Sequence, residues 1–170
     1  RGHLAALAGR DSFDYVGEFS SRVTVDLIFA LFNLPDEGRE TVRDKAVLMT
    51  QTDPVLRGKG PEQLEAYQWM ADYAARLVAE RKRQPGDDLL SNFITAEIDG
   101  EKLEDREVQL TVTTLIMAGI ESLSGFLSML GLNLARFPDV RRALVIDPGL
   151  IPDAIEESLR YNTSAQRFRR

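Results

Sequence analysis

The stretch from Leu110 to Asn133 constrains the fold most strongly, because it is long and apolar and carries a charge near its centre. Its middle, Ala118-Gly-Ile-Glu-Ser122, places a carboxylate directly beside a hydroxyl. Burying a charge without partners costs free energy, so Glu121 needs a structural or functional reason.

Three interpretations of this stretch compete. The first is a transmembrane helix, which has sufficient length but would carry a charge near the bilayer centre at a cost of about 2.5–3.5 kcal/mol. The second is an ordinary core helix with a polar stripe that faces solvent. The third is a long central helix whose midpoint faces a reaction site. Adjacent helical residues point about 100° apart, so Glu121 and Ser122 can reach the same cavity wall, and Gly119 would let a ligand approach the backbone.

The composition describes an acidic globular chain without cysteine. Its 170 residues are 44% hydrophobic and 28% charged with a net charge of −6, which suits one domain-sized piece with an apolar core. The acidic balance argues against nucleic acid as a partner. The lack of cysteine excludes disulfides and thiolate metal sites within the chain, and His3, as the single histidine, builds no metal site alone.

The first residues contain no recognisable targeting signal. Arg1 is followed by no apolar signal region, and we find no further candidate span. We therefore expect a soluble, cytoplasmic protein without membrane contact, and the first residue suggests a fragment.

The remaining pattern is helical. Apolar residues that recur at spacings of three and four, together with proline and glycine punctuation, predict helices over 4–7, 13–32, 35–50, 62–84, 89–97, 104–137, 138–146 and 151–161. Asp99-Gly100 predicts the tip of a hairpin. The fold class is therefore mainly α, with about eight or nine helices and minimal strand.

Two of these helices have explicit apolar stripes. The stripe of the helix over 13–32 consists of Phe13, Val16, Phe19, Val23, Leu27 and Leu31. The stripe of the helix over 62–84 consists of Leu64, Tyr67, Met70, Ala71, Ala74, Leu77 and Val78. Such stripes are typical of helices that pack on a core along one face.

The motif around Glu121 resembles a family signature. Ala-Gly-Ile-Glu-Ser is similar to the Ala/Gly-Gly-x-Asp/Glu-Thr/Ser signature of the long oxygen-activating helix of cytochromes P450. Glu157-Ser-Leu-Arg160 resembles the Glu-x-x-Arg motif in the corresponding later helix of that family. The intervening Leu-Ala-Arg-Phe-Pro-Asp-Val-Arg-Arg-Ala-Leu and the closing Gln-Arg-Phe-Arg-Arg also look like bacterial members. The resemblance implies a single partial domain over 1–170, a partial cytochrome P450 fold around one long central helix.

This resemblance implies a haem-thiolate monooxygenase that inserts one oxygen atom of O2 into a hydrophobic small molecule and takes electrons from a ferredoxin or flavoprotein. The axial cysteine would lie outside this chain, so we expect the fragment alone to be inactive. Glu121 would be the acid that relays protons and Ser122 the partner alcohol. Most members have threonine in place of Ser122. Serine keeps the hydroxyl but lacks the methyl group that helps to fix the rotamer.

The resemblance assigns further residues. Ala118, Gly119 and Arg169 would contact the haem, with the Arg169 guanidinium suited to a propionate. The substrate contacts would be Thr114, Met117 and Ala165, and the structural pair would be Glu157 and Arg160.

Each assignment has an ordinary structural alternative. The substrate contacts are equally explained by core packing. The structural alternative for Ser122 is a bond to a carbonyl one turn back, and the alternative for Glu157 and Arg160 is an exposed ion pair of little energetic weight.

Two other classes of function are compatible with a helical chain. The first is a non-enzymatic, all-helical interaction module, which would tolerate replacement of Glu121 by glutamine. The second is a carboxylate-bridged metal bundle, which needs Glu-x-x-His pairs. The sequence contains no such pair, so the interaction module is the stronger alternative.

Overall fold

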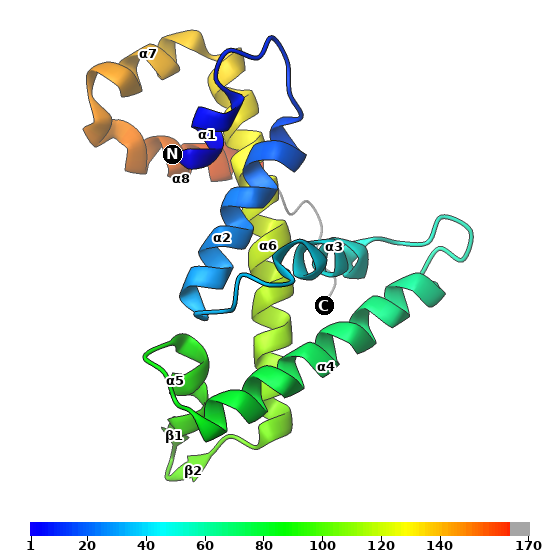
Figure 1. Cartoon of the computed structure of the whole chain (residues 1–170). Helices are drawn as coiled ribbons and strands as arrows, with labels where there is room; N and C mark the ends of the chain where they lie inside the picture. Colours follow the sequence, from blue (N-terminus) through cyan, green and yellow to red (C-terminus); the bar gives the residue numbers. More distant parts are fainter. Residues whose placement is uncertain (164–170) are drawn as a thin grey trace. The chain divides into compact units, whose positions relative to one another are not determined.

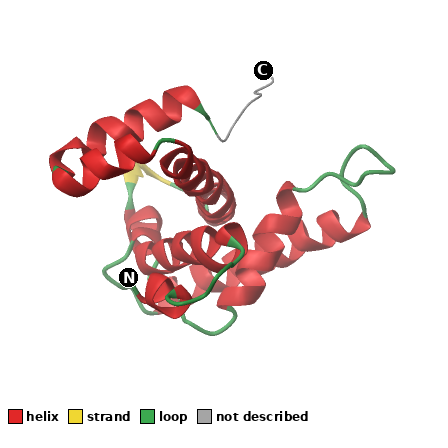
Figure 2. Ribbon diagram, turned by 90° about the horizontal axis from the view of Figure 1, so that it is seen from above, coloured by secondary structure: helices red, strands yellow, loops and turns green. Residues whose placement is uncertain are grey.

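The computed structural model describes residues 1–163, and helices form nearly all of their regular structure (Figures 1 and 2). In chain order the elements are α1 (Gly2–Leu7), the π-helical turn η1 (Val16–Ser20), α2 (Ser21–Leu31), α3 (Arg39–Thr50), α4 (Pro61–Arg83), α5 (Leu89–Thr95), β1 (Glu97–Ile98), β2 (Glu101–Lys102), α6 (Asp105–Arg136), α7 (Pro138–Ile146), the 3-10 turn η2 (Pro148–Leu150) and α8 (Ile151–Tyr161). The predicted mainly α fold with one long helix is confirmed.

Some boundaries differ from the prediction for local reasons. The helix expected from residue 35 begins at Arg39, because Gly38 adopts a left-handed conformation with φ of 80°. The helix expected over 13–32 is divided into η1 and α2. The predicted hairpin is present: β1 and β2 pair antiparallel, and Asp99 and Gly100 form the tip with positive φ angles of 55° and 86°.

The contacts divide the chain into two compact units. The core unit is Thr24–Glu121, and the terminal unit consists of Arg1–Val23 and Ser122–Arg170. One boundary falls inside α6, between Glu121 and Ser122. The single partial domain over 1–170 stays a prediction.

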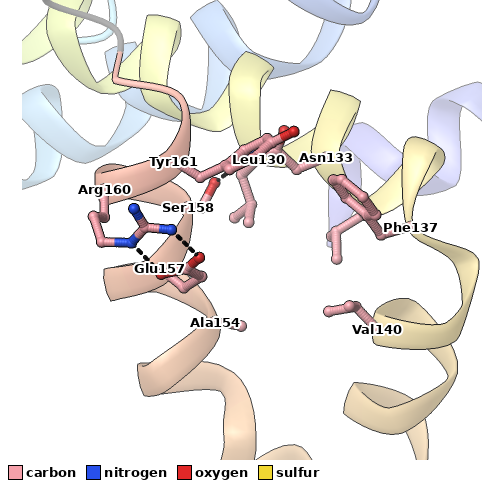
Figure 3. A pocket seen from close by; sticks show the side chains of 10 residues that line it. Leu130, Asn133, Phe137, Val140, Ala154, Glu157, Ser158, Arg160 and Tyr161 are labelled. Atoms are coloured by element: carbon pink, nitrogen blue, oxygen red, sulfur yellow. Dashed lines mark hydrogen bonds and ion pairs between the residues drawn. The ribbon is translucent and has the colours of Figure 1, made fainter.

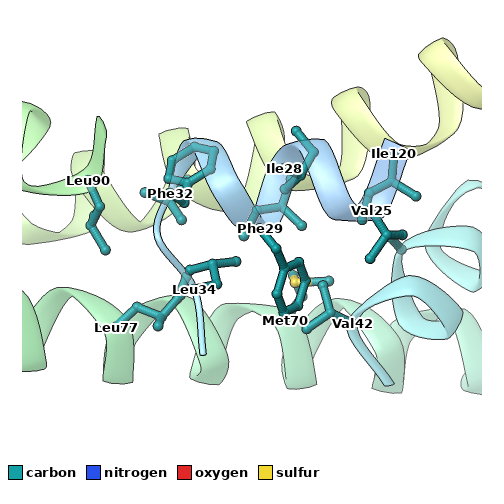
Figure 4. Close-up of a cluster of buried hydrophobic side chains, with 14 of the residues drawn as sticks. Val25, Ile28, Phe29, Phe32, Leu34, Val42, Met70, Leu77, Leu90 and Ile120 are labelled. Atoms are coloured by element: carbon teal, nitrogen blue, oxygen red, sulfur yellow. The ribbon is translucent and has the colours of Figure 1, made fainter. Parts of the chain in front are cut away.

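The core unit has a continuous apolar interior (Figure 4). Helix α6 contributes every fourth residue, which places these side chains on one face: Val108, Val112, Ile116 and Ile120. Helices α2 to α5 and their connections supply the rest, including Val25, Ile28, Phe29, Phe32, Val42, Met49, Met70, Leu77 and Leu90. The Thr24 hydroxyl donates to the Ile120 carbonyl at 3.2 Å, which ties α2 to the middle of α6.

The buried faces of α2 and α4 are rotated relative to the predicted stripes. On α2, Leu27 and Leu31 are 55% and 51% exposed, whereas Ile28 and Phe29 are buried. On α4 the predicted Met70, Ala74, Leu77 and Val78 are buried, but Leu64, Tyr67 and Ala71 are exposed. Gln63 is buried instead, because its Oε1 accepts a hydrogen bond from the Gly60 N–H at 3.0 Å and so caps the helix.

A buried ion pair closes the far end of α4. The Asp88 side chain accepts from Arg81 Nε at 2.7 Å and from the Ser91 N–H at 2.8 Å. Arg81 also donates to the Asn33 carbonyl at 2.7 Å. Asp88 therefore caps α5 and, through Arg81, connects the ends of α2 and α4.

The terminal unit buries few large apolar side chains. Its buried residues include Ser20, Ser124, Asn133 and Ser158, and the one buried aliphatic side chain among its described residues is Leu7. Ser128 Oγ donates to the Ser124 carbonyl at 2.8 Å and lies 3.1 Å from Ser20 Oγ. Hydrogen bonds between small polar side chains thus replace an apolar interior here.

Candidate active site

The predicted site residues on α6 are distributed over the two faces of this helix. Opposite the buried stripe, Leu110, Thr114 and Ala118 recur every fourth residue and are exposed. Ser122 continues this spacing and is also exposed. Near the middle of α6, the exposed side chains are therefore small and partly polar.

Glu121 lies between these two faces and is half-buried. Desolvation raises the pKa of its carboxyl group, and a hydrogen bond with the Thr50 side chain at the end of α3 opposes this increase. Among the described residues no charged side chain contributes to the shift. Glu121 thus keeps a proton to higher pH than an ordinary glutamate, a property expected of a group that transfers protons.

Thr50 was not identified from the sequence. Its hydroxyl donates to the Val47 carbonyl at 2.7 Å and also interacts with Glu121. Thr50 and Glu121 lie far apart in the chain, and a threonine at a helix end is common. No sequence signal could have linked the two residues.

Gly119 has a different role from the one predicted. A Cβ atom at this position would lie 2.4 Å from Ile28 Cδ1, so the space beside the glycine is filled by α2. The expectation that the missing side chain leaves the backbone open to a ligand is therefore corrected: it allows α6 and α2 to pack closely. A contact between Gly119 and a haem stays a prediction.

The other predicted contacts fall into three groups. Thr114 and Ala118 are on the exposed side of α6, whereas Met117 is half-buried and packs against the apolar core. Ala165 and Arg169 lie outside the described residues. The structure thus gives Met117 a packing role and leaves the predicted functions of all five residues open to experiment.

Glu157 and Arg160 form a two-fold hydrogen-bonded ion pair on α8. Arg160 Nη2 and Nε donate to the two carboxylate oxygens at 2.6 and 2.7 Å, and both side chains are exposed. The hydrogen bond from Arg160 lowers the pKa of the Glu157 carboxyl group. The spacing of three residues explains the pairing, because it places both side chains on one helix face.

A pocket of about 380 Å³ lies in the terminal unit beside this ion pair (Figure 3). Its lining comes from α6 (Leu130, Asn133 and Leu134), from Phe137 and Val140 at the start of α7, and from α8 (Ala154, Glu157, Ser158, Arg160 and Tyr161). Asn133 and Ser158 were not singled out from the sequence. The available signal was a polar residue inside an otherwise apolar helical stripe.

The haem that the resemblance implies can be tested against these residues. The small exposed side chains of Thr114 and Ala118 leave room for a flat ring to lie close to α6, so this face fits the group. The axial thiolate does not come from these residues, because the chain has no cysteine.

Helix α6 is also the described helix that is long and apolar enough to cross a membrane, although a core helix of a soluble protein passes the same test. Its stripe from Val108 to Ile120 is buried against α2 to α5. This packing places one face of α6 in the core of the protein, whereas only 17% of the apolar window of the helix is buried.

Comparison with known proteins gives one consistent family. The family profile "Cytochrome P450" matches residues 40–146. Cytochrome P450 107B1 of Saccharopolyspora erythraea is 35% identical over 161 residues, which cover 94% of this chain and 38% of the relative. A putative cytochrome P450 123 of Mycobacterium tuberculosis is 31% identical over 164 residues, 96% of this chain and 41% of the relative.

Solved structures agree with these sequence relatives. The cytochrome P450 PksS of the Bacillus subtilis bacillaene polyketide synthase has a TM-score of 0.86 at 28% identity, over 94% of this chain and 40% of its own. Mycobacterium marinum CYP268A2, solved with pseudoionone, has a TM-score of 0.82 at 28% identity over the same shares. The chain thus spans about 40% of the length of the relatives that it matches.

Proposed function

The chain belongs to the cytochrome P450 family, and we propose that it is the middle part of a bacterial haem-thiolate monooxygenase. The full protein would insert one oxygen atom of O2 into a hydrophobic small molecule and receive electrons from a ferredoxin or flavoprotein. It would work in the cytoplasm. The 170 residues alone would have no monooxygenase activity, because the cysteine that holds the haem is not among them.

In this proposal the haem, when bound, supplies the activation of dioxygen. Glu121 holds a proton at its carboxyl group and passes it toward the open side of α6, while Ser122 offers a hydroxyl that orients the neighbouring oxygen or water. Ala118 forms the helix surface against the ring, and Gly119 would contact the ring only through the part of its backbone that Ile28 does not cover. Arg169 binds a haem propionate through its guanidinium.

The remaining predicted residues shape the surroundings. Thr114, Met117 and Ala165 contact the substrate, and Met117 is suited to this because its flexible thioether adapts to irregular apolar shapes. Glu157 and Arg160 act as a structural pair that fixes the position of α8 in the enzyme.

One observation carries the proposal. Glu121 is a half-buried acid whose pKa is raised by desolvation, and the small exposed side chains of Thr114 and Ala118 precede it on the same helix. A helix that served only as a scaffold would gain nothing from a desolvated carboxyl group without a charged partner.

The test is the substitution Glu121→Gln in the full-length protein that carries these residues. We expect product formation to fall about 100-fold or more, as for the loss of a general acid, while reduction under carbon monoxide still gives the thiolate-haem Soret shift. Glu156→Gln on α8 is the matched control, because Glu156 is exposed and has no assigned role.

The same substitution separates the enzyme from a helical interaction module. Unchanged product formation by the Glu121→Gln protein would remove Glu121 from the mechanism. A full-length protein without a thiolate-haem spectrum would reject the enzyme itself and favour the interaction module.

A further inference from the structure

One buried polar atom of the terminal unit has no hydrogen-bond partner in the part of the chain that the structure describes. The Asn133 side chain is 8% exposed. Its Nδ2 donates to Ser158 Oγ at 2.8 Å, whereas Oδ1 is buried and unpartnered. Because buried amide oxygens are nearly always hydrogen-bonded, Oδ1 indicates a partner from elsewhere.

Asn133 forms part of the pocket wall between α6 and α8 (Figure 3). Helix α6 presents Leu130, Asn133 and Leu134 at i, i+3 and i+4 to the pocket, followed by Phe137 just after the helix and Val140 of α7. Helix α8 presents Ala154, Glu157, Ser158 and Tyr161 at i, i+3, i+4 and i+7. The two rows meet at the bond between Asn133 and Ser158. The Asn133 amide therefore belongs to the pocket wall and not to the outer surface of the helix.

The walls define what the pocket accepts. They are mainly apolar, and Phe137 and Tyr161 form an edge-to-face aromatic pair with ring centres 5.7 Å apart. A volume of about 380 Å³ is within the range of small-molecule sites. A single water molecule is a poor occupant, because it needs two to four polar neighbours.

We propose that this pocket binds an apolar, ring-sized group that donates one hydrogen bond to Asn133 Oδ1. Because Oδ1 can only accept, the occupant must supply an N–H or O–H. The apolar walls and the size of the pocket favour a donor that is carried on an aromatic ring. The occupant is uncharged, since Glu157 and Arg160 at the rim already neutralise each other through two hydrogen bonds.

The source of this group is a side chain of the longer polypeptide, and this step rests on the proposed function. The chain covers 38% and 41% of two of its relatives. In addition, α7 has no buried residue and α8 buries only Ser158. Helices this uncovered beside an apolar pocket are expected where further parts of a larger fold pack on them.

The chemistry of the pocket can be tested on the 170-residue chain with indole and benzofuran. The two molecules have nearly the same shape, but indole has an N–H where benzofuran has an oxygen. We expect indole to bind with about tenfold higher affinity, the worth of one hydrogen bond. The amide signals of Asn133 and Ser158 in NMR titrations give both dissociation constants.

Two variants locate the effect. Asn133→Leu should abolish the preference for indole while leaving the apolar walls in place, and Ser158→Ala should keep the preference because Oδ1 remains. Equal affinity for the two probes in the unchanged chain would overturn the proposal, and so would tighter binding of benzofuran or no binding of either. The comparison of probes needs no variant to fold.

The source is tested separately in a protein extended to the length of the relatives. Loss of indole binding in that protein supports a side chain as the occupant, whereas retained binding with the same preference overturns this source in favour of a free small molecule. Neither titration requires haem or turnover. The pocket can thus fail while the monooxygenase proposal stands, and the reverse also holds.

Discussion

The two units of the chain stabilise themselves in different ways. The core unit buries large apolar side chains from five helices and their connections, including Phe29, Phe32 and Met70 at 2% exposure or less. The terminal unit buries serines and an asparagine and leaves Val145 and Ile146 78% and 84% exposed. The same polypeptide therefore contains one region with its own apolar interior and another whose apolar residues largely face solvent.

This difference indicates which part of the chain depends on other packing partners. Exposed large apolar residues on α7 and α8 lower the solubility and the stability of an isolated piece. The relatives are about two and a half times as long as this chain, since it covers 38–41% of them. The core unit should consequently retain its structure in isolation better than the terminal unit does.

The largest expected effect comes from one substitution made in both units. Phe32→Ala in the core unit removes a fully buried ring and should cost about 3–5 kcal/mol of unfolding free energy. Phe137→Ala in the terminal unit removes a ring that is 42% exposed and should cost about 1 kcal/mol. Urea unfolding followed by circular dichroism measures both, and equal costs would contradict the comparison.

Buried polar groups provide a second, smaller contrast. Asp88→Asn removes the charge that pairs with Arg81 and should cost about 1.5–3 kcal/mol. Asn133 and Ser158 share one hydrogen bond, and the amide oxygen of Asn133 has no partner among the described residues. The double variant Asn133→Leu, Ser158→Ala removes both partners of this bond, so the free energy of unfolding should stay the same or increase. Thermal unfolding of the two proteins gives the signs, and a strongly destabilised double variant would contradict this view of Asn133.

The Asp88 pair also has a pH signature. Desolvation raises the pKa of this carboxyl group, but hydrogen bonds from Ser91 and Arg81 outweigh it, so that the net pKa is lowered below its usual 3.8. A lowered pKa in the folded state adds stability that is complete above the unfolded-state pKa and is lost as the pH falls through the folded-state value. Asp88→Asn should remove this part of the acid destabilisation.

The sequence predicted the elements better than their orientations. Proline and glycine marked the ends of α7 correctly and those of α4 to within one residue, and Asp99-Gly100 identified the hairpin. The apolar pattern of residues 13–32 did not reveal the buried face, because Leu27 and Leu31 fit the stripe as well as Ile28 and Phe29 do. Which side of an apolar helix is covered depends on tertiary packing, which local spacing does not encode.

The candidate site was predicted only in part, and the reason is again that tertiary packing is not encoded in local spacing. The motif located Glu121 and Ser122, and the structure adds that they lie at the edge of an exposed face of α6. The motif could not indicate that Thr50 interacts with Glu121 or that Ile28 fills the space beside Gly119. Both contacts join segments distant in the chain.

A further prediction concerns Glu121, the half-buried acid of the core unit. Thr50→Val removes the hydrogen bond that lowers the pKa of Glu121, so this pKa should rise further above its ordinary value. A raised carboxyl pKa adds stability that is complete below the unfolded-state pKa and is lost as the pH rises through the folded-state value. Carbon-13 NMR of the Glu121 carboxyl group follows the titration, with Thr52→Val as the control. An unchanged pKa in Thr50→Val would remove Thr50 from the site.

The smallest effect is expected at Glu157 and Arg160. Both side chains are exposed and pair with each other, so Arg160→Gln should leave the unfolding midpoint of this chain unchanged while it returns the lowered pKa of Glu157 toward its ordinary value. The same substitution in the full-length protein should destabilise it, because the resemblance places this pair against residues outside the chain. A clear loss of stability in the 170-residue chain would instead show that the pair already acts within the terminal unit, and would weaken the contrast between the two units.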